Sequence, residues 1–221
     1  LHGLNFSESS TLTLDHAFLE NWADTWMDAS NVTLEMYNSS VFKQAGDNYH
    51  SQGYNQHIIV DDSVFWGSNG GKWNLARDRN GSGGKYVIDI YGTHPYVEMA
   101  DHLLHCSTSG HNDHDLTMDL VFHVPAGGYE TAPLNCYQSS FYATSDTPLK
   151  ISVAKDSPAR RAGKRITTNL VHSESGFSYW QEHDKYLMDF SPEDKPVIRY
   201  SDDGKNIEVE IPNSGFKVFI K

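Results

Sequence analysis

The strongest constraint on the fold is the unbroken alternation of side chains along residues 116–124 (LTMDLVFHV). Successive side chains of an extended strand point to opposite faces of a sheet, so this alternation predicts a strand with one buried face. Shorter runs at 31–37, 57–60, 63–66 and 85–91 have the same period and are separated by Gly, Asn and Ser clusters. The side chains expected on the buried face of 116–124 are Leu116, Met118, Leu120, Phe122 and Val124, with Asp119 and His123 on the opposite face.

The last third of the chain continues the strand pattern. Residues 149–154 and 165–171 predict two more strands. Residues 197–220 are typical of an antiparallel meander, because turn-forming residues at 201–204 and 212–215 separate three apolar runs. We therefore expect an all-β protein.

One segment predicts a helix. Along residues 15–27, Phe18, Trp22 and Trp26 recur every four residues, which predicts a short N-terminal amphipathic helix lying on a sheet. No internal repeat or linker stands out, so residues 1–221 are predicted to form a single domain. Short strands without interposed helices favour an antiparallel two-sheet sandwich of the jelly-roll or immunoglobulin-like kind.

The net charge of −12 restricts the partners. Nucleic acid and anionic membrane surfaces would be repelled, whereas neutral glycans and other proteins would not. No apolar run approaches the roughly 18 to 20 residues that a membrane-spanning helix needs. We therefore expect a neutral glycan or protein partner, no nucleic acid and no membrane insertion, and an oligomer is compatible with these properties.

Two further features indicate an extracellular protein. Cys106 and Cys136 form an even pair, and an oxidising compartment would allow them to form a disulfide, whereas in the cytosol they would be free thiols. Asn-x-Ser/Thr sequences mark acceptor sites for N-glycosylation. These predicted glycosylation sites are Asn5, Asn31, Asn38 and Asn80.

A histidine-rich stretch spans residues 102–123. Imidazoles two or three residues apart, with aspartates nearby, can direct several lone pairs at one transition-metal ion such as zinc or copper. The alternative is a polar loop with surface histidines. The candidate ligands are His102, His105, His111, His114 and His123.

A calcium site is predicted at residues 78–89. Oxygen-bearing side chains occupy positions 1, 3, 5 and 12 of this segment, with Gly83 at position 6, as a loop wrapping a hard cation requires. The segment resembles the calcium loops of EF-hand and dockerin type, which implies that Ca²⁺ is the ligand. The alternative is a Gly-rich turn. The predicted ligands are Asp78, Asn80, Ser82 and Asp89.

Aromatic side chains among amides and histidines predict a sugar-binding surface. Exposed rings stack on sugar faces while amides bind hydroxyl groups, although core packing would also explain such rings. The candidate binding residues are Tyr54, Trp66 and Trp73. The sequence favours an extracellular glycoprotein module with a binding or structural role, and its partner would be a glycan or a protein. The alternatives are a secreted carbohydrate-active enzyme, a glycoside hydrolase or polysaccharide lyase, and a metal-binding protein that uses residues 102–123.

Overall fold

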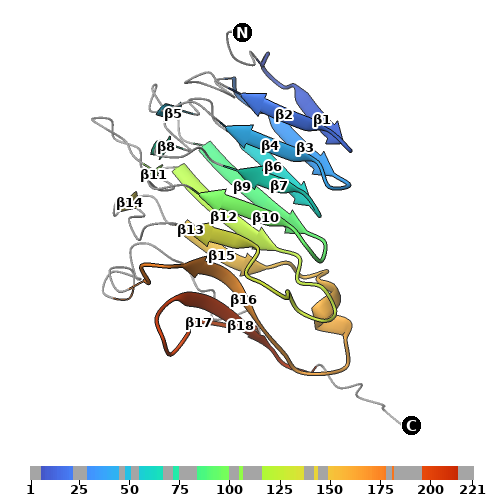
Figure 1. The fold of residues 1–221 in the computed structure, drawn as a ribbon, viewed down its shortest axis with the longest axis vertical. Helices are drawn as coiled ribbons and strands as arrows, with labels where there is room; N and C mark the ends of the chain where they lie inside the picture. Colours follow the sequence, from blue (N-terminus) through green and yellow to red (C-terminus); the bar gives the residue numbers. More distant parts are fainter. Residues whose placement is uncertain are drawn as a thin grey trace.

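The computed structural model describes most of the chain in segments. These are residues 6–21, 29–44, 48–50, 55–66, 72–74, 84–99, 105–106, 116–136, 142–143, 149–177, 181 and 196–213. Within them the protein consists almost entirely of short strands arranged as a stack (Figure 1).

Sheet A contains six strands that all run in the same direction. Each strand pairs with the sheet A strand that follows it in the chain, in parallel. In spatial order the strands are β1 (Thr11–Asp15), β3 (Thr33–Tyr37), β6 (Gln56–Asp61), β9 (Gly84–Tyr91), β12 (Leu116–Phe122) and β15 (Leu149–Val153).

Sheet B contains the strands that alternate with those of sheet A along the chain. Its first six strands pair in parallel. The strand β18 then pairs antiparallel with β16, and β17 pairs antiparallel with β18. In spatial order they are β2 (Phe18–Asn21), β4 (Val41–Gln44), β7 (Val64–Trp66), β10 (Tyr96–Met99), β13 (Leu134–Cys136), β16 (Ile166–Ser173), β18 (Asn206–Ile211) and β17 (Val197–Tyr200).

Two small parallel sheets and one helical turn complete the described elements. The strand β5 (Asn48–His50) pairs with β8 (Lys72–Asn74), and β11 (His105–Cys106) pairs with β14 (Tyr142–Ala143). The 3₁₀ turn η1 (Pro158–Arg161) lies between β15 and β16. Each coil of the chain therefore adds one strand to sheet A and one to sheet B, which makes the protein a parallel β-solenoid.

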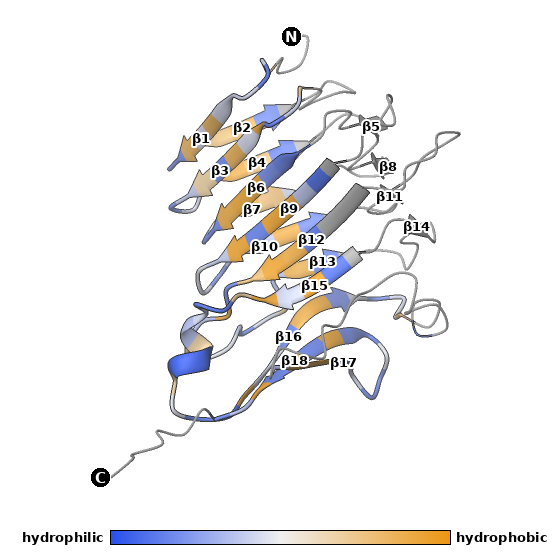
Figure 2. Cartoon of the chain, turned by 180° about the vertical axis from the view of Figure 1, so that it is seen from behind, coloured by the Kyte–Doolittle hydropathy of each residue, from blue (hydrophilic) through white to orange (hydrophobic). Residues whose placement is uncertain are grey.

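The hydrophobic core lies between sheets A and B. Alternate residues of both sheets are fully buried, such as Ile88 and Ile90 of β9 and Val97 of β10. Figure 2 shows the resulting apolar bands on the strands of both sheets. The predicted inward face of 116–124 is confirmed where burial is described, since Leu120, Phe122 and Val124 are all completely buried.

The antiparallel sandwich predicted from the sequence is wrong. Sheet A is entirely parallel, and in sheet B only the pairs that involve β18 are antiparallel. A period of two residues fixes which side chains are buried, but it carries no information on strand direction. The antiparallel hairpin between β17 and β18 is confirmed, whereas the predicted turn at 212–215 extends beyond the described residues.

The predicted helix at 15–27 is also wrong where the structure describes it. Residues Phe18–Asn21 form β2, which pairs with β4 through Phe18 to Val41 and Leu19 to Phe42. Phe18 is 66% exposed, whereas Leu19 packs against the core. Pairing with the next coil therefore overrides the four-residue spacing of the aromatic side chains.

The described helices are too short to cross a membrane, since none combines the length and the apolar character that a spanning helix requires.

Candidate functional site

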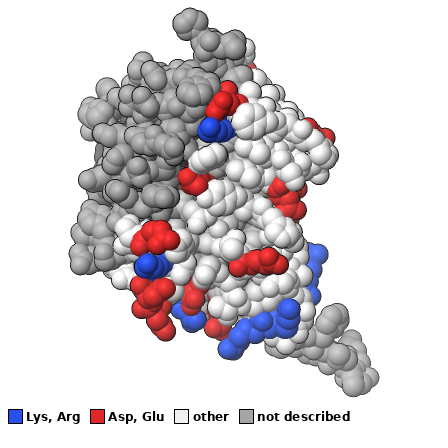
Figure 3. Space-filling model, viewed as in Figure 1, with Lys and Arg blue, Asp and Glu red and all other residues white. Residues whose placement is uncertain are grey.

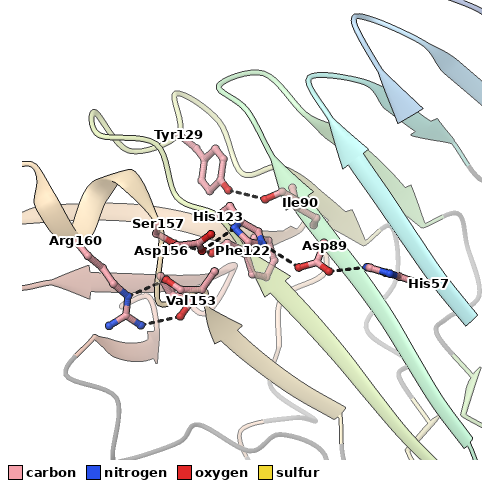
Figure 4. A network of polar contacts seen from close by, with 11 residues as sticks. His57, Asp89, Ile90, Phe122, His123, Tyr129, Val153, Asp156, Ser157 and Arg160 are labelled. Carbon is pink, nitrogen blue, oxygen red and sulfur yellow. Dashed lines mark hydrogen bonds and ion pairs between the residues drawn. The ribbon is translucent and has the colours of Figure 1, made fainter. Parts of the chain in front are cut away.

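Three side chains form a diagonal line across the outer face of sheet A (Figure 4). Asp89 of β9 contacts His57 of β6 with one carboxylate oxygen and His123, just after β12, with the other. The Nε2 atoms of the two rings lie 2.7 Å and 2.9 Å from Oδ2 and Oδ1 of Asp89, respectively. The register explains this line, because Asp89 pairs with Ile59 and Val121, and each histidine lies two residues from one of those partners.

The two histidines determine the charge of Asp89. Burial alone would raise the pKa of this carboxyl, whose side chain is 15% exposed. Hydrogen bonds from His123 and His57, together with their charges, outweigh burial and lower the pKa of Asp89 to about 2. Asp89 is therefore a carboxylate under all ordinary conditions and fixes the orientation of both rings.

His123 is held between two carboxylates. Its Nδ1 atom lies 3.2 Å from Oδ1 of Asp156, on the side of the ring opposite Asp89. The ring of Tyr91 stacks on the His123 ring, with 3.6 Å between the centroids and 18° between the planes. A ring that faces carboxylates with both nitrogens can donate to both only when both nitrogens carry protons.

The turn after β15 places Asp156 at this site. Ser157 donates from Oγ to the Phe122 carbonyl at 3.2 Å, which ties the turn to the end of β12. Arg160 donates to the carbonyl oxygens of Val153 and Ala154 at 2.7 Å and 2.9 Å (Figure 4). These bonds fix the backbone on both sides of Asp156, although its side chain is 72% exposed.

A second turn forms the opposite side of the site. The Asp62 carboxylate accepts hydrogen bonds from the backbone N–H groups of Thr93 and His94, at 2.6 Å and 2.7 Å. Gly92, which follows Tyr91, has a φ of +89°, and a Cβ there would lie 2.3 Å from the Asp62 carboxylate. Glycine is therefore required for this turn to approach Asp62.

A pocket of about 490 Å³ opens between these two turns. Its walls include Tyr91, His123 and Asp156, as well as Gly92 and Pro158. A volume of this size fits a small organic ligand or one or two units of a polymer.

Neighbouring residues on sheet A extend the polar character of the site. Asp61 pairs with Tyr91 in the register. Burial and the nearby charge of Asp62 raise the pKa of the Asp61 carboxyl, although the charge of His123 lowers it. Burial and the charges of Asp89, Asp156 and Asp61 raise the pKa of Tyr91. The Tyr91 hydroxyl therefore keeps its proton and can act as a donor beside three carboxyl groups.

Of the aromatic candidates predicted from the sequence, Trp66 lies away from this pocket. Trp66 lies on sheet B and donates from Nε1 to Oε1 of Glu98 at 2.7 Å. Trp73 is in β8, and Tyr54 lies outside the described residues. Glu98 is likewise on sheet B, so the core separates it from Asp89 on sheet A.

The predicted metal ligands are mostly outside the described residues. This holds for His102, His111 and His114 and for Asp78, Asn80 and Ser82, while His105 is in β11. The two described members with known contacts, Asp89 and His123, bind each other. Among the described residues no group of three or more His, Cys, Asp or Glu side chains is arranged to hold a metal, and both metal sites stay predictions.

The predicted disulfide and glycosylation sites are only partly described. Cys106 is in β11 beside Ala143, whereas Cys136 ends β13 beside Met99 and Ser173, and their bond stays a prediction. Asn31 and Asn38 are exposed. The Nδ2 atom of Asn38 donates to Asp15 at 2.7 Å, and Oδ1 of Asn31 accepts from Asn55 at 3.1 Å. Asn5 and Asn80 lie outside the described residues.

The sequence did not single out Tyr91, Asp156 or Asp61 as site residues, and it assigned Asp89 and His123 to two different metal sites. The available signal was that Asp61, Tyr91 and His123 each stand at or just after the end of an apolar strand. Such positions become neighbours only when the strands are parallel and in register.

Comparison with known proteins identifies no relative whose function could guide the interpretation of this site. No family model, curated protein or solved structure matches the chain. The chemistry of the pocket must therefore be inferred from its own side chains.

Proposed function

We propose that the protein is an extracellular binding module whose ligand is a neutral glycan held in the sheet A pocket. The stacked pair of Tyr91 and His123 in the pocket wall, with the Asp156 carboxylate beside it, is the observation that carries this proposal. Aromatic rings offer an apolar surface to sugar C–H groups, and carboxylates accept hydrogen bonds from sugar hydroxyls.

The charges of the protein support a neutral ligand. The three carboxyl groups near Tyr91 disfavour an anionic ligand, as does the net charge of −12. On the face in Figure 3, acidic side chains are scattered over a mostly uncharged surface, and basic side chains gather toward the lower end. Secretion, the Cys106–Cys136 disulfide and sugars on Asn31 and Asn38 are part of the same proposal, because each requires an oxidising or secretory environment.

Substitution of Tyr91 tests the pocket. Tyr91→Ala removes the stacking surface and is expected to weaken the binding of a neutral hexasaccharide about tenfold, which corresponds to ~1.4 kcal/mol. Tyr91→Phe keeps the ring and should bind much more strongly than Tyr91→Ala. Calorimetric titration with hexasaccharides of β-1,4-linked glucose, mannose and xylose measures both.

The matched control is Val197→Ala, which shortens an exposed apolar side chain on β17 of sheet B. It should bind like the unmodified protein. If Tyr91→Ala and Val197→Ala bind all three hexasaccharides equally well, or if the unmodified protein binds none, the pocket is not a glycan site.

A second candidate is hydrolysis of the bound glycan. The observation in its favour is that two carboxyl groups of opposite behaviour lie near the pocket residue Tyr91, although neither lines the pocket itself: Asp61 has a raised pKa and Asp89 a pKa of about 2. Glycoside hydrolysis uses one protonated and one ionised carboxyl group. New reducing ends in the same hexasaccharide mixtures, lost in Asp61→Asn, would indicate an enzyme, whereas binding without new reducing ends indicates a module that only binds.

A further inference from the structure

A second row of side chains crosses the outer face of sheet B. Consecutive members pair directly in the register, one from each neighbouring strand. Because neighbouring strands lie about 4.8 Å apart, six of them carry the row over about 24 Å. The members of this row, the Trp66 row, are Glu20, Lys43, Trp66, Glu98, Asn135 and His172.

The centre of the Trp66 row is fixed by its own contacts. The Trp66 indole donates from Nε1 to Glu98 at 2.7 Å, and the Tyr96 hydroxyl donates to the other oxygen of Glu98. Lys43 places its Nζ atom 5.2 Å from the centroid of the Trp66 ring and 2.7 Å from Oε1 of Glu20. An aromatic side chain held in this way loses little conformational entropy when a ligand binds.

The charges of the row match an uncharged polar ligand. Lys43 and Glu20 neutralise each other, and each Glu98 oxygen accepts one bond from an aromatic side chain while it retains a further lone pair for a hydroxyl donor. In the described part of the chain the large exposed hydrophobic residues are Phe18 and Val197. They lie on β2 and β17, at opposite ends of sheet B, and between them the members of the Trp66 row are polar or charged apart from Trp66 itself.

We propose that the Trp66 row is a second glycan site, on which an extended neutral glycan lies across the strands of sheet B. The sugar rings contact Trp66 and Tyr96, and their hydroxyl groups bind Glu98 and Asn135. The site is separate from the sheet A pocket, because the hydrophobic core lies between the two sheets. The protein then has two glycan-binding faces and can link two glycan chains.

Calorimetric titration with the three hexasaccharides tests the second site in the full chain. The unmodified protein should bind two molecules of the preferred hexasaccharide, and Trp66→Ala should bind one, with the remaining affinity unchanged. Val197→Ala lies five strands away in sheet B and should still bind two. A stoichiometry that is the same for Trp66→Ala as for the unmodified protein overturns the proposal.

A measurement without substitution guards against a misfolded variant. Hydroxyl-radical footprinting of the unmodified protein should show that saturating hexasaccharide protects Trp66 and Tyr96 at least threefold and leaves the oxidation of Val197 unchanged. Oxidation of Trp66 at the same rate with and without the hexasaccharide counts against the site.

The two glycan sites fail in different ways. If Tyr91→Ala weakens all the observed binding about tenfold and Trp66→Ala leaves it unchanged, the sheet A pocket stands and the Trp66 row is overturned. If Trp66→Ala removes all binding and Tyr91→Ala none, the row stands and the pocket is overturned. No binding of any hexasaccharide by the unmodified protein overturns both.

Discussion

At Asp89, two hydrogen bonds decide the protonation state of a carboxyl group that the sheet partly buries. Burial favours the neutral acid, but His57 and His123 favour the carboxylate and bring its pKa from 3.8 to about 2. The same two bonds join three coils of the solenoid, since the histidines come from β6 and from the residue after β12. The site therefore also stabilises the packing of neighbouring coils.

This carboxylate makes a pH-dependent contribution to stability. Its pKa is lower in the folded state than in the unfolded chain, so its contribution is fully present above about pH 3.8 and is lost as the pH falls toward 2. The difference in unfolding free energy between the unmodified protein and Asp89→Asn should therefore shrink across that range. Urea unfolding at a series of pH values measures this difference.

Asp119→Asn is the matched control, because Asp119 is a carboxylate on the same face of sheet A and contacts Lys85 at 3.0 Å instead of a histidine. If the difference in unfolding free energy between Asp89→Asn and the unmodified protein stays constant from pH 4 to pH 2, the histidine bonds do not cause the low pKa of Asp89.

At the scale of the element, β12 combines core and site. Phe122 is completely buried, whereas the His123 side chain, one residue later, faces outward and is 10% exposed. The alternation predicted this division. It also indicated that any function of His123 must recruit residues from a neighbouring strand or from the 102–115 loop, and Asp89 of β9 is such a residue of a neighbouring strand.

Two substitutions at adjacent positions should therefore separate stability from function. Phe122→Ala leaves a cavity in the core and should lower the unfolding free energy by about 3 to 5 kcal/mol. His123→Ala should leave the fold intact and weaken hexasaccharide binding. Thermal and urea unfolding compare the two, and equal losses of stability would make His123 a core residue instead of a site residue.

The sequence predicted the positions of most strands but not their arrangement. Burial of alternate side chains is a local property, so β3, β6, β9 and β15 were identified close to their bounds. Strand direction depends on the path of the chain between strands, which alternation does not record. At β2 the spacing of aromatic residues indicated a helix, and only pairing with β4 makes that segment a strand.

The coil repeat was hidden for a related reason. Thr33 pairs with His57, and Val87 pairs with Asp119, so the number of residues per coil is unequal and no fixed period appears in the sequence. The site was hidden with it, because Asp89, His123 and Asp156 become neighbours only through that repeat. Asp89 and His123 were candidates by residue type and Asp156 was not, and the contacts among the three could not be predicted.

At the scale of the whole molecule, the described strands of sheet B end in a change of direction. The strand β16 pairs in parallel with β13 on one side and antiparallel with β18 on the other, and β17 completes the hairpin. The buried side chains Ile207, Val209 and Ile211 of β18 belong to the core. The hairpin therefore covers the strand edge and the apolar surface of the last parallel strand.

Removal of this hairpin should cause self-association. A chain ending at residue 195 lacks β17 and β18 and leaves the β16 edge unpaired, so its apparent mass should rise with concentration in light scattering. A chain ending at residue 213 keeps the hairpin and should match the full chain. Equal masses for the two truncated chains would show that the hairpin does not protect this edge.

The unequal coils also bear on how such a chain can diverge. The pairing of its strands fixes the position of each coil in the stack. The segments that connect one strand to the next along the chain take no part in this pairing. Insertions and deletions there leave the rise from one strand to the next unchanged, so natural variation in length should accumulate between coils. The two outer faces can then acquire different ligand preferences independently, while the buried ladder of side chains between them stays the same.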